Sequence, residues 1–176
     1  MGIDILHLSA DEEEEKPLSA DKRKVSIIGC KGVGKRTILA SLPGSVISDA
    51  GDDESLMRLK NAEADNLNFV LMSSELIRKN PNQSRFLKGS VVVFVVTDST
   101  FRTVADAGKT IKTISDFLKT PPKFVILANK KDQPKSMAIP AIANLLKLPE
   151  NDIFEFIAIS DGASDRLMGI MQQFLP

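Results

Sequence analysis

The sequence predicts an α/β fold in which helices cover both faces of a largely parallel sheet. From residue 22 onward, short apolar runs of strand character alternate with longer patterns of helical period. Residues 91–96 form an uninterrupted run, Val-Val-Val-Phe-Val-Val, which is typical of a strand buried on both faces. A glycine-rich loop at residues 29–35 follows the first apolar run and precedes a helical pattern.

Each expected strand is a mainly apolar segment bounded by polar, glycine or proline residues. We expect strands at residues 25–28, 56–60, 67–72, 91–96, 124–128 and 154–159. We expect helices at 35–42, 104–118, 140–146 and 165–174, with proline residues directly after the first and shortly after the second. A short polar stretch joins the second strand to the third, which predicts an antiparallel hairpin at a sheet edge.

The composition is that of one ordinary domain with an acidic extension. The chain has 176 residues, of which 43% are hydrophobic and 26% charged, and its net charge is zero. This charge balance gives no reason to expect a nucleic-acid partner. The chain has a single cysteine and no apolar run long enough to span a membrane, which favours a cytoplasmic protein. Residues 1–21 carry seven acidic residues and one basic residue, so we expect a flexible segment ahead of a domain at 22–176.

The loop at residues 29–35 has the pattern G-x-x-x-x-G-K between a strand and a helix. Phosphate oxygens need several backbone N–H donors that converge, and side chains would block their approach. Gly29, Gly32 and Gly34 keep the loop clear, and Lys35 can reach the terminal phosphates with its ammonium group. The sequence therefore predicts a phosphate site here.

A second motif, N-K-x-D, directly follows the strand expected at residues 124–128. The carboxylate of Asp132 can accept both the N1–H and the exocyclic N2–H of guanine, a pair of donors that adenine lacks. We expect Asn129 to tie this loop to the phosphate loop and the aliphatic stem of Lys130 to cover the base. Together the two motifs predict a guanine-nucleotide site.

These motifs resemble those of the Ras-superfamily small GTPases, and most closely the ADP-ribosylation-factor (Arf) branch. The likeness is carried by residues 35–39, 94–99 and 128–137, which are similar to the Arf patterns G-K-T-T-I-L, F-V-V-D-S and A-N-K-x-D-x-P-x-A-M. The resemblance implies a P-loop type, three-layer fold with a six-stranded, mixed but mostly parallel sheet. It implies GTP or GDP as ligand and a loop after the last strand that contacts guanine through a backbone amide, here expected at Ser160 and Asp161. The phosphate-binding residues would then be Gly29, Lys31, Gly32, Val33, Gly34, Lys35, Arg36 and Thr37, and the guanine-binding residues Asn129, Lys130, Asp132, Ser160 and Asp161.

The sequence departs from the family at the residues that serve hydrolysis. Arg36 stands where the family has the hydroxyl that holds Mg²⁺, and no threonine occurs from residue 38 to 96 to supply the second metal ligand. The D-x-x-G motif after the third strand is also missing, with Ser73 and Leu76 at its Asp and Gly positions, and Ile77 stands where the family has the Gln that positions a water molecule. We therefore expect no catalytic residues, no metal ligands and impaired or absent hydrolysis.

The sequence favours a guanine-nucleotide-binding, Arf-like protein that acts as an interaction module for effector or regulatory proteins. Two interpretations of Arg36 stay open: together with Lys31 it replaces the charge of the missing Mg²⁺, or it faces solvent. A working GTPase switch with unusual residues and a nucleotide-free scaffold both stay open, and a nucleotide kinase is disfavoured by the guanine motif. Membrane contact is expected only through the N-terminal segment or a partner.

Overall fold

The computed structural model describes residues 23–42, 57–60 and 67–175. Three expectations therefore fall outside the described residues. These are the acidic segment at 1–21, residues 45–55, which the resemblance to the small GTPases would make the first switch segment, and the connection between the two strands of the expected hairpin.

The sheet brings together the carboxyl ends of five parallel strands. These are β3 (Leu67–Ser73), β1 (Arg23–Gly29), β4 (Ser90–Thr97), β5 (Lys123–Ala128) and β6 (Ile153–Glu155), in that spatial order. Beside β3, at the edge, lies β2 (Met57–Lys60), which pairs antiparallel with it. The register sets Gly29 opposite Ser73, so the loops that follow β1 and β3 leave the sheet side by side.

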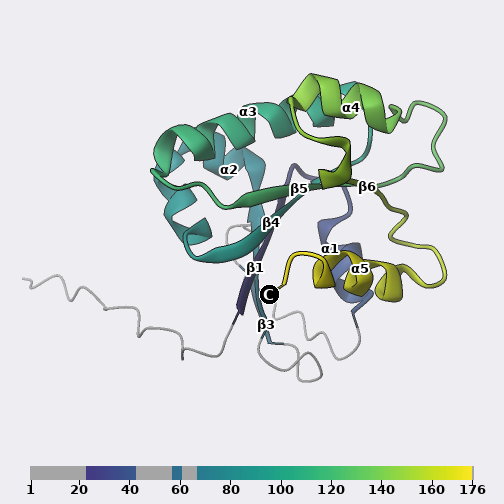
Figure 1. Cartoon of the computed structure of the whole chain (residues 1–176), viewed down its shortest axis with the longest axis horizontal. Coiled ribbons are helices and arrows are strands. Elements are labelled where there is room, and N and C mark those ends of the chain that lie inside the picture. Colours follow the sequence, from purple (N-terminus) through teal and green to yellow (C-terminus); the bar gives the residue numbers. More distant parts are fainter. Residues whose placement is uncertain (1–22, 43–56, 61–66, 176) are drawn as a thin grey trace, which may run out of the picture.

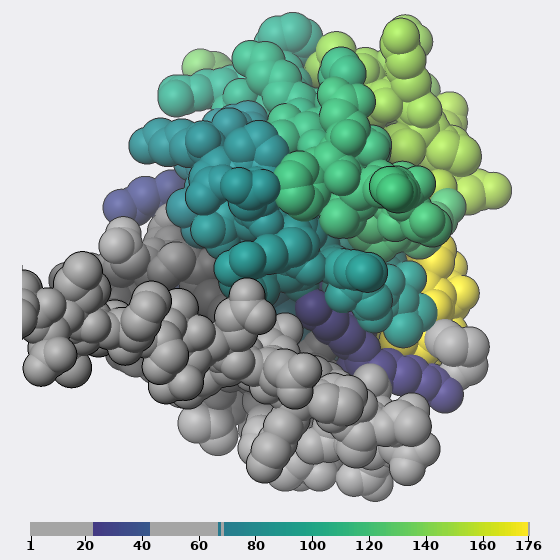
Figure 2. Space-filling model, turned by 90° about the vertical axis from the view of Figure 1, so that its left-hand side faces the viewer, coloured from purple at the N-terminus to yellow at the C-terminus, as the bar shows by residue number. Residues whose placement is uncertain are grey.

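Helices cover both faces of this sheet (Figure 1). Packed against one face are α1 (Lys35–Ala40) and α5 (Ala163–Gln172). The other face carries α2 (Ser74–Lys79), α3 (Phe101–Phe117) and α4 (Ile139–Leu146). Two 3-10 segments, η1 (Pro81–Leu87) and η2 (Glu150–Asp152), lead into β4 and β6. In the side view the layer of α2, α3 and α4 forms one continuous surface above the yellow surface of α5 (Figure 2).

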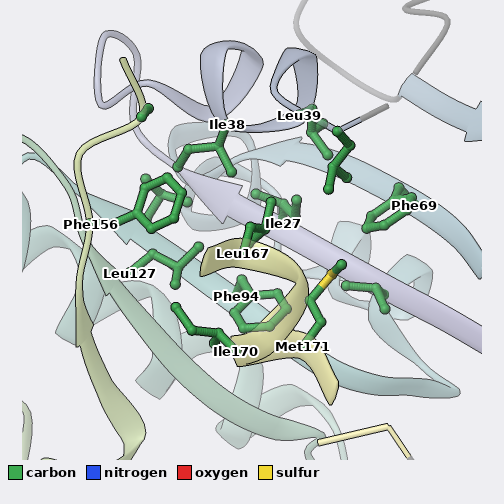
Figure 3. Close-up of a cluster of buried hydrophobic side chains, with 14 of the residues drawn as sticks. Ile27, Ile38, Leu39, Phe69, Phe94, Leu127, Phe156, Leu167, Ile170 and Met171 are labelled. Atoms are coloured by element: carbon green, nitrogen blue, oxygen red, sulfur yellow. The ribbon is translucent and has the colours of Figure 1, made fainter. Parts of the chain in front are cut away.

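Strand alternation divides the apolar side chains into two cores, one on each face. Figure 3 shows the core beneath α5, where Ile27, Phe94 and Leu127 of three neighbouring strands meet Leu167 and Met171. Their neighbours along the strands point to the opposite core beneath α3 and α4, as the period of a strand requires. The central strands are therefore buried on both faces, which explains their continuous apolar sequence.

The structure confirms an α/β fold with a parallel sheet between layers of helices. It differs from the sequence prediction at the last strand, because β6 ends at Glu155 instead of continuing to residue 159. The chain turns there, and the N–H of Ser160 donates to the carbonyl of Ile157. Neither α2 nor η1 is predicted from the sequence, because their short lengths give too few turns for a helical period to stand out. Among the described residues, no helix is both long and apolar enough to cross a bilayer.

Removing a central aromatic side chain should destabilise the whole domain. Phe94 is fully buried between the strands and α5, so Phe94→Ala leaves a cavity and should cost about 3–5 kcal/mol in the free energy of unfolding. The matched control is Phe101→Ala, because Phe101 is 65% exposed and should change that free energy by about 0.5 kcal/mol or less. Urea titration of both variants measures the difference, and equal losses would contradict the core described above.

Candidate functional site

The glycine-rich loop connects β1 to α1 at the carboxyl edge of the sheet. Gly32 and Gly34 have φ angles of 81° and 99°, a left-handed region that other residues rarely adopt. A Cβ atom on Gly34 would lie 2.4 Å from the side-chain nitrogen of Asn129, and one on Gly29 would lie 2.6 Å from the carbonyl oxygen of Val96. These glycines are needed both for backbone shape and for close approach of neighbouring loops.

Lys35 places a positive charge inside this loop. Its Nζ atom donates to the carbonyl oxygens of Gly29 and Cys30, at 2.6 and 2.7 Å. The residue is only 7% exposed, so its ammonium group is held in place and not free to sample solvent. A fixed, largely buried cation beside a glycine-rich loop is suited to bind an anion.

Asn129 joins the three loops that follow β1, β5 and β6. Its Nδ2 donates to the carbonyl of Val33 at 2.9 Å, and its Oδ1 accepts the backbone N–H of Ala158 at 3.0 Å. The residue is 2% exposed, so these hydrogen bonds are shielded from water. The tie between Asn129 and the glycine-rich loop that the sequence predicted is present.

Further hydrogen bonds fix the position of the Asn129 loop. The side chain of Lys130 donates from Nζ to the carbonyl of Gly32 at 2.8 Å, which adds a second link to the glycine-rich loop. Ser99 donates from its hydroxyl to the carbonyl of Asn129 at 2.6 Å, and its own carbonyl accepts the N–H of Met137. The loop is thus held on both sides before any ligand arrives.

A pocket opens where these three loops meet. Its base-recognition candidate is Asp132, and Gly34 and Thr37 of the glycine-rich loop and α1 also line it. Ile159 is 81% exposed and lines the pocket, which leaves an apolar side chain available to a bound molecule. The complete lining is Gly34, Thr37, Asn129, Lys130, Asp132, Gln133, Ile157, Ala158 and Ile159.

The residues proposed from sequence fall into three groups. Gly34, Thr37, Asn129, Lys130 and Asp132 line the pocket, and Gly29, Val33 and Lys35 form the framework of the adjoining loop. By contrast, Arg36, Ser160 and Asp161 are exposed and are not part of the pocket lining, and Lys31 and Gly32 are also exposed.

The residues after β6 that line the pocket come earlier in the sequence than expected. Ile157, Ala158 and Ile159 line it, whereas the sequence assignment was Ser160 and Asp161. The hydroxyl of Ser160 instead donates to the carbonyl of Ile157 within the turn. This loop was not recognised from the sequence because residues 154–159 were predicted to form one strand. The only signal for its role was the pair of apolar residues Ile157 and Ile159, which are suited to pack against a planar ring.

Sequence reasoning missed Glu75, which lies in the first turn of α2 beside the glycine-rich loop. Ser73 donates from its hydroxyl to the Glu75 carboxylate at 2.6 Å, and Ser73 lies opposite Gly29 in the register of β1 and β3. Burial by itself would raise the pKa of this carboxyl, but hydrogen bonding, with the Ser73 hydroxyl first, and the charge of Arg78 lower it below its usual value. The charged form is therefore favoured next to the loop.

Asp98, at the end of β4, is a second ionised carboxylate near the site. Its Oδ1 accepts hydrogen bonds from the hydroxyls of Thr100 and Thr103 and from the N–H of Thr100. Partial burial raises the pKa of this group, but the hydrogen bonds and the charge of Lys130 outweigh burial and lower it. Asp98 thus fixes the start of α3 against the Asn129 loop.

The thiol of Cys30, in the glycine-rich loop, is poorly suited to act as a nucleophile. Burial raises the pKa of this thiol, and the negative charge of Glu75 raises it further. The thiol form, which is a poor nucleophile, therefore dominates near neutral pH.

The described residues of the site fit a guanine nucleotide better than they fit Mg²⁺. The loop carries a fixed ammonium for phosphate, and Asp132 offers a carboxylate to a base. At the family's metal position, however, the guanidinium of Arg36 has no lone pair with which to bind a cation. The nearby hydroxyl of Ser73 is already engaged with Glu75.

Comparison with known proteins does not identify the chain, because no protein-family model and no curated protein matches it.

Removing the Asn129 side chain should loosen all three loops at once. Asn129→Ala leaves the carbonyl of Val33 and the N–H of Ala158 without partners in a buried position, which should cost about 2 kcal/mol or more in the free energy of unfolding. Asn151→Ala is the control, since Asn151 is exposed. Urea unfolding of both variants gives the comparison, and an Asn129→Ala loss no larger than that of the control would show that the bridge contributes nothing.

The contribution of Asp98 to stability should depend on pH. Because its pKa is lowered in the folded state, its stabilisation is complete above the usual aspartate value of 3.8 and is lost as the pH falls through the lower folded value. Near neutral pH, Asp98→Asn should cost about 1 kcal/mol through weaker hydrogen bonds. Unfolding measured from pH 7 to pH 3 should show the gap between wild type and variant shrinking at the acid end. A gap that is constant or grows at low pH would contradict this assignment.

Proposed function

We propose that the protein binds a guanine nucleotide at the junction of the glycine-rich loop and the Asn129 loop, as a small-GTPase-like protein of Arf type. The observation that carries the proposal is the Asn129 bridge, which joins a lysine-containing glycine-rich loop to a loop bearing Asp132. The proposed phosphate-binding loop and the proposed base-binding loop thus meet at one edge of the pocket. The six-stranded mixed sheet of that family and a cytoplasmic location belong to the same proposal.

The chemistry of Asp132 supports guanine as the base. A carboxylate accepts two hydrogen bonds from the N1–H and N2–H of guanine, whereas adenine presents no matching pair. Lys130 and Ile159 both line the same pocket, where the lysine stem and the isoleucine side chain offer apolar surface to a flat ring.

The surroundings of the loop argue against efficient hydrolysis. Transfer of a phosphoryl group to water depends on a metal ion and on a positioned water molecule. Arg36 is exposed at the metal position, and Ser73, Leu76 and Ile77 replace the Asp, Gly and Gln of the second switch segment. Ile77 is moreover fully buried in the core under α3, so it is unavailable to position a water molecule. We therefore propose binding without a Mg²⁺ requirement and an interaction role with protein partners.

A nucleotide-free scaffold is the second candidate, and one observation favours it. The ammonium of Lys35 is already bonded to two carbonyls, and the carbonyl of Gly32 already accepts from Lys130. A loop whose polar groups are paired internally has less need of a ligand.

Changing Asp132 should change the base that is bound. Asp132→Asn replaces one acceptor oxygen with an N–H₂ donor, so guanine loses a partner and xanthine, which carries a carbonyl at position 2, gains one. We expect GDP affinity to fall by about 100-fold or more and affinity for xanthosine diphosphate to rise. Calorimetric titration measures both, with Asp165→Asn on exposed α5 surface as the control. If Asp132→Asn still prefers GDP to xanthosine diphosphate as strongly as the wild type does, the base does not contact Asp132.

Identification of the native ligand tests the proposal as a whole. The purified protein is denatured and any released nucleotide is identified by ion-exchange chromatography, with and without prior EDTA treatment. We expect guanine nucleotide in both samples, because the described residues of the loop do not fit Mg²⁺. Loss of the nucleotide after EDTA would contradict metal-independent binding, and an adenine nucleotide would contradict the assignment of the base. An absence of nucleotide in both samples would favour the scaffold.

A further inference from the structure

Ser99, in the short connection between β4 and α3, has an unusual backbone conformation for its residue type. Its φ angle is 65°, in the left-handed region that glycine adopts readily and that costs other residues free energy. The residue is also completely buried, with an exposed fraction of 0%. A strained backbone persists only where neighbouring contacts hold it, so the contacts of Ser99 indicate what the strain serves.

Ser99 is bonded to the Asn129 loop at two points that lie on either side of Asp132. Its hydroxyl donates to the carbonyl of Asn129 at 2.6 Å. Its own carbonyl accepts the backbone N–H of Met137 at 2.7 Å. Asp132, the residue proposed to recognise the base, stands between these two points in the chain and lines the pocket. A single buried residue therefore closes the loop that carries Asp132.

The hydrogen bond from the Ser99 hydroxyl also bears on the conformation of Lys130. It holds the carbonyl of the peptide group that joins Asn129 to Lys130, and Lys130 has a left-handed φ of 57°. Of the three residues other than glycine that have a positive φ in the described part of the chain, two are thus linked at this site, and the third, Lys147, ends α4. From its left-handed position Lys130 donates to the carbonyl of Gly32 at 2.8 Å.

We propose that Ser99 is a positioning residue for base recognition, whose hydroxyl sets the orientation of Asp132 without touching the nucleotide. This inference rests on the proposed guanine-nucleotide function. Two simultaneous hydrogen bonds from N1–H and N2–H to one carboxylate require a narrow range of distance and angle. A loop that is held at both ends keeps Asp132 within that range. A loop released at Asn129 samples other orientations, so it loses preference for guanine.

The test compares GDP with inosine diphosphate, which keeps N1–H but lacks the exocyclic N2 amino group, by calorimetric titration. The wild type should bind GDP about tenfold or more tightly, because inosine leaves one acceptor of Asp132 unpaired. Ser99→Gly removes the hydroxyl and permits the left-handed backbone, and the ratio of the two affinities should fall to about threefold or less. Ser99→Ala removes the same hydroxyl but keeps the backbone strain, so it should lower the ratio equally.

The two variants separate a positioning role from a merely structural one. Ser99→Gly should unfold at a higher temperature than Ser99→Ala, because only glycine relieves the strain at this φ angle. Base preference should therefore follow the hydroxyl, which both variants lack, while stability follows the backbone, in which they differ. The matched control is Ser90→Ala at the other end of β4, where the hydroxyl pairs with that of Ser26 at 2.7 Å. This control should keep the wild-type ratio.

Each outcome of the comparison decides the proposal. A wild-type ratio in Ser99→Gly would overturn it, and so would a ratio that falls only in Ser99→Ala, since backbone strain would then be the cause. If the wild type binds neither nucleotide or shows no preference, the proposed recognition of guanine by Asp132 fails. Hydrogen exchange of backbone amides in the ligand-free protein then decides the role of Ser99.

The amides to follow in that exchange experiment are those of Met137 and Ala158, which donate to Ser99 and to the Asn129 side chain. Faster exchange of both in Ser99→Gly, with the amides of β4 unchanged, would support positioning of the Asn129 loop by the Ser99 hydroxyl. Exchange equal to that of the wild type would overturn it.

Discussion

The geometry of the site depends on the side chain of Asn129. This single buried amide donates to the glycine-rich loop and accepts from the loop after β6, while its own backbone is held by Ser99. Three connections that are far apart in sequence thereby converge at one edge of the sheet. The same contact explains Gly34, because any Cβ at that position would collide with the Asn129 side chain. The loop geometry is therefore a consequence of one hydrogen-bonding group and the space reserved for it.

Two opposite charges define the other side of the site. Lys35 is held inside the glycine-rich loop by two carbonyl oxygens, and Glu75 lies just after β3, whose last residue Ser73 is opposite Gly29 in the register. A fixed cation and a carboxylate thus lie near each other at this edge of the sheet.

Much of this architecture could be predicted from sequence because it rests on local patterns. The continuous apolar run of β4 and the glycine-rich loop between β1 and α1 each carry their signal within a few residues. The role of Asn129 could also be predicted, from its place in N-K-x-D directly after a strand. The position of Ile159 could not, because β6 is only three residues long and the turn after it leaves little local trace. Glu75 lies beside the glycine-rich loop only because β3 is next to β1 in the observed register, which no local pattern encodes.

The most direct measurement is a titration of the isotope-labelled protein with GDP, followed by two-dimensional ¹H–¹⁵N NMR. The account predicts that the largest shifts fall on the glycine-rich loop at residues 29–37, the Asn129 loop at 129–133 and the loop at 157–159, with ADP producing much smaller ones at equal concentration. Shifts of equal size with ADP would contradict recognition of the base by Asp132. Shifts confined to another face of the sheet, or no shifts at millimolar GDP, would contradict the site itself.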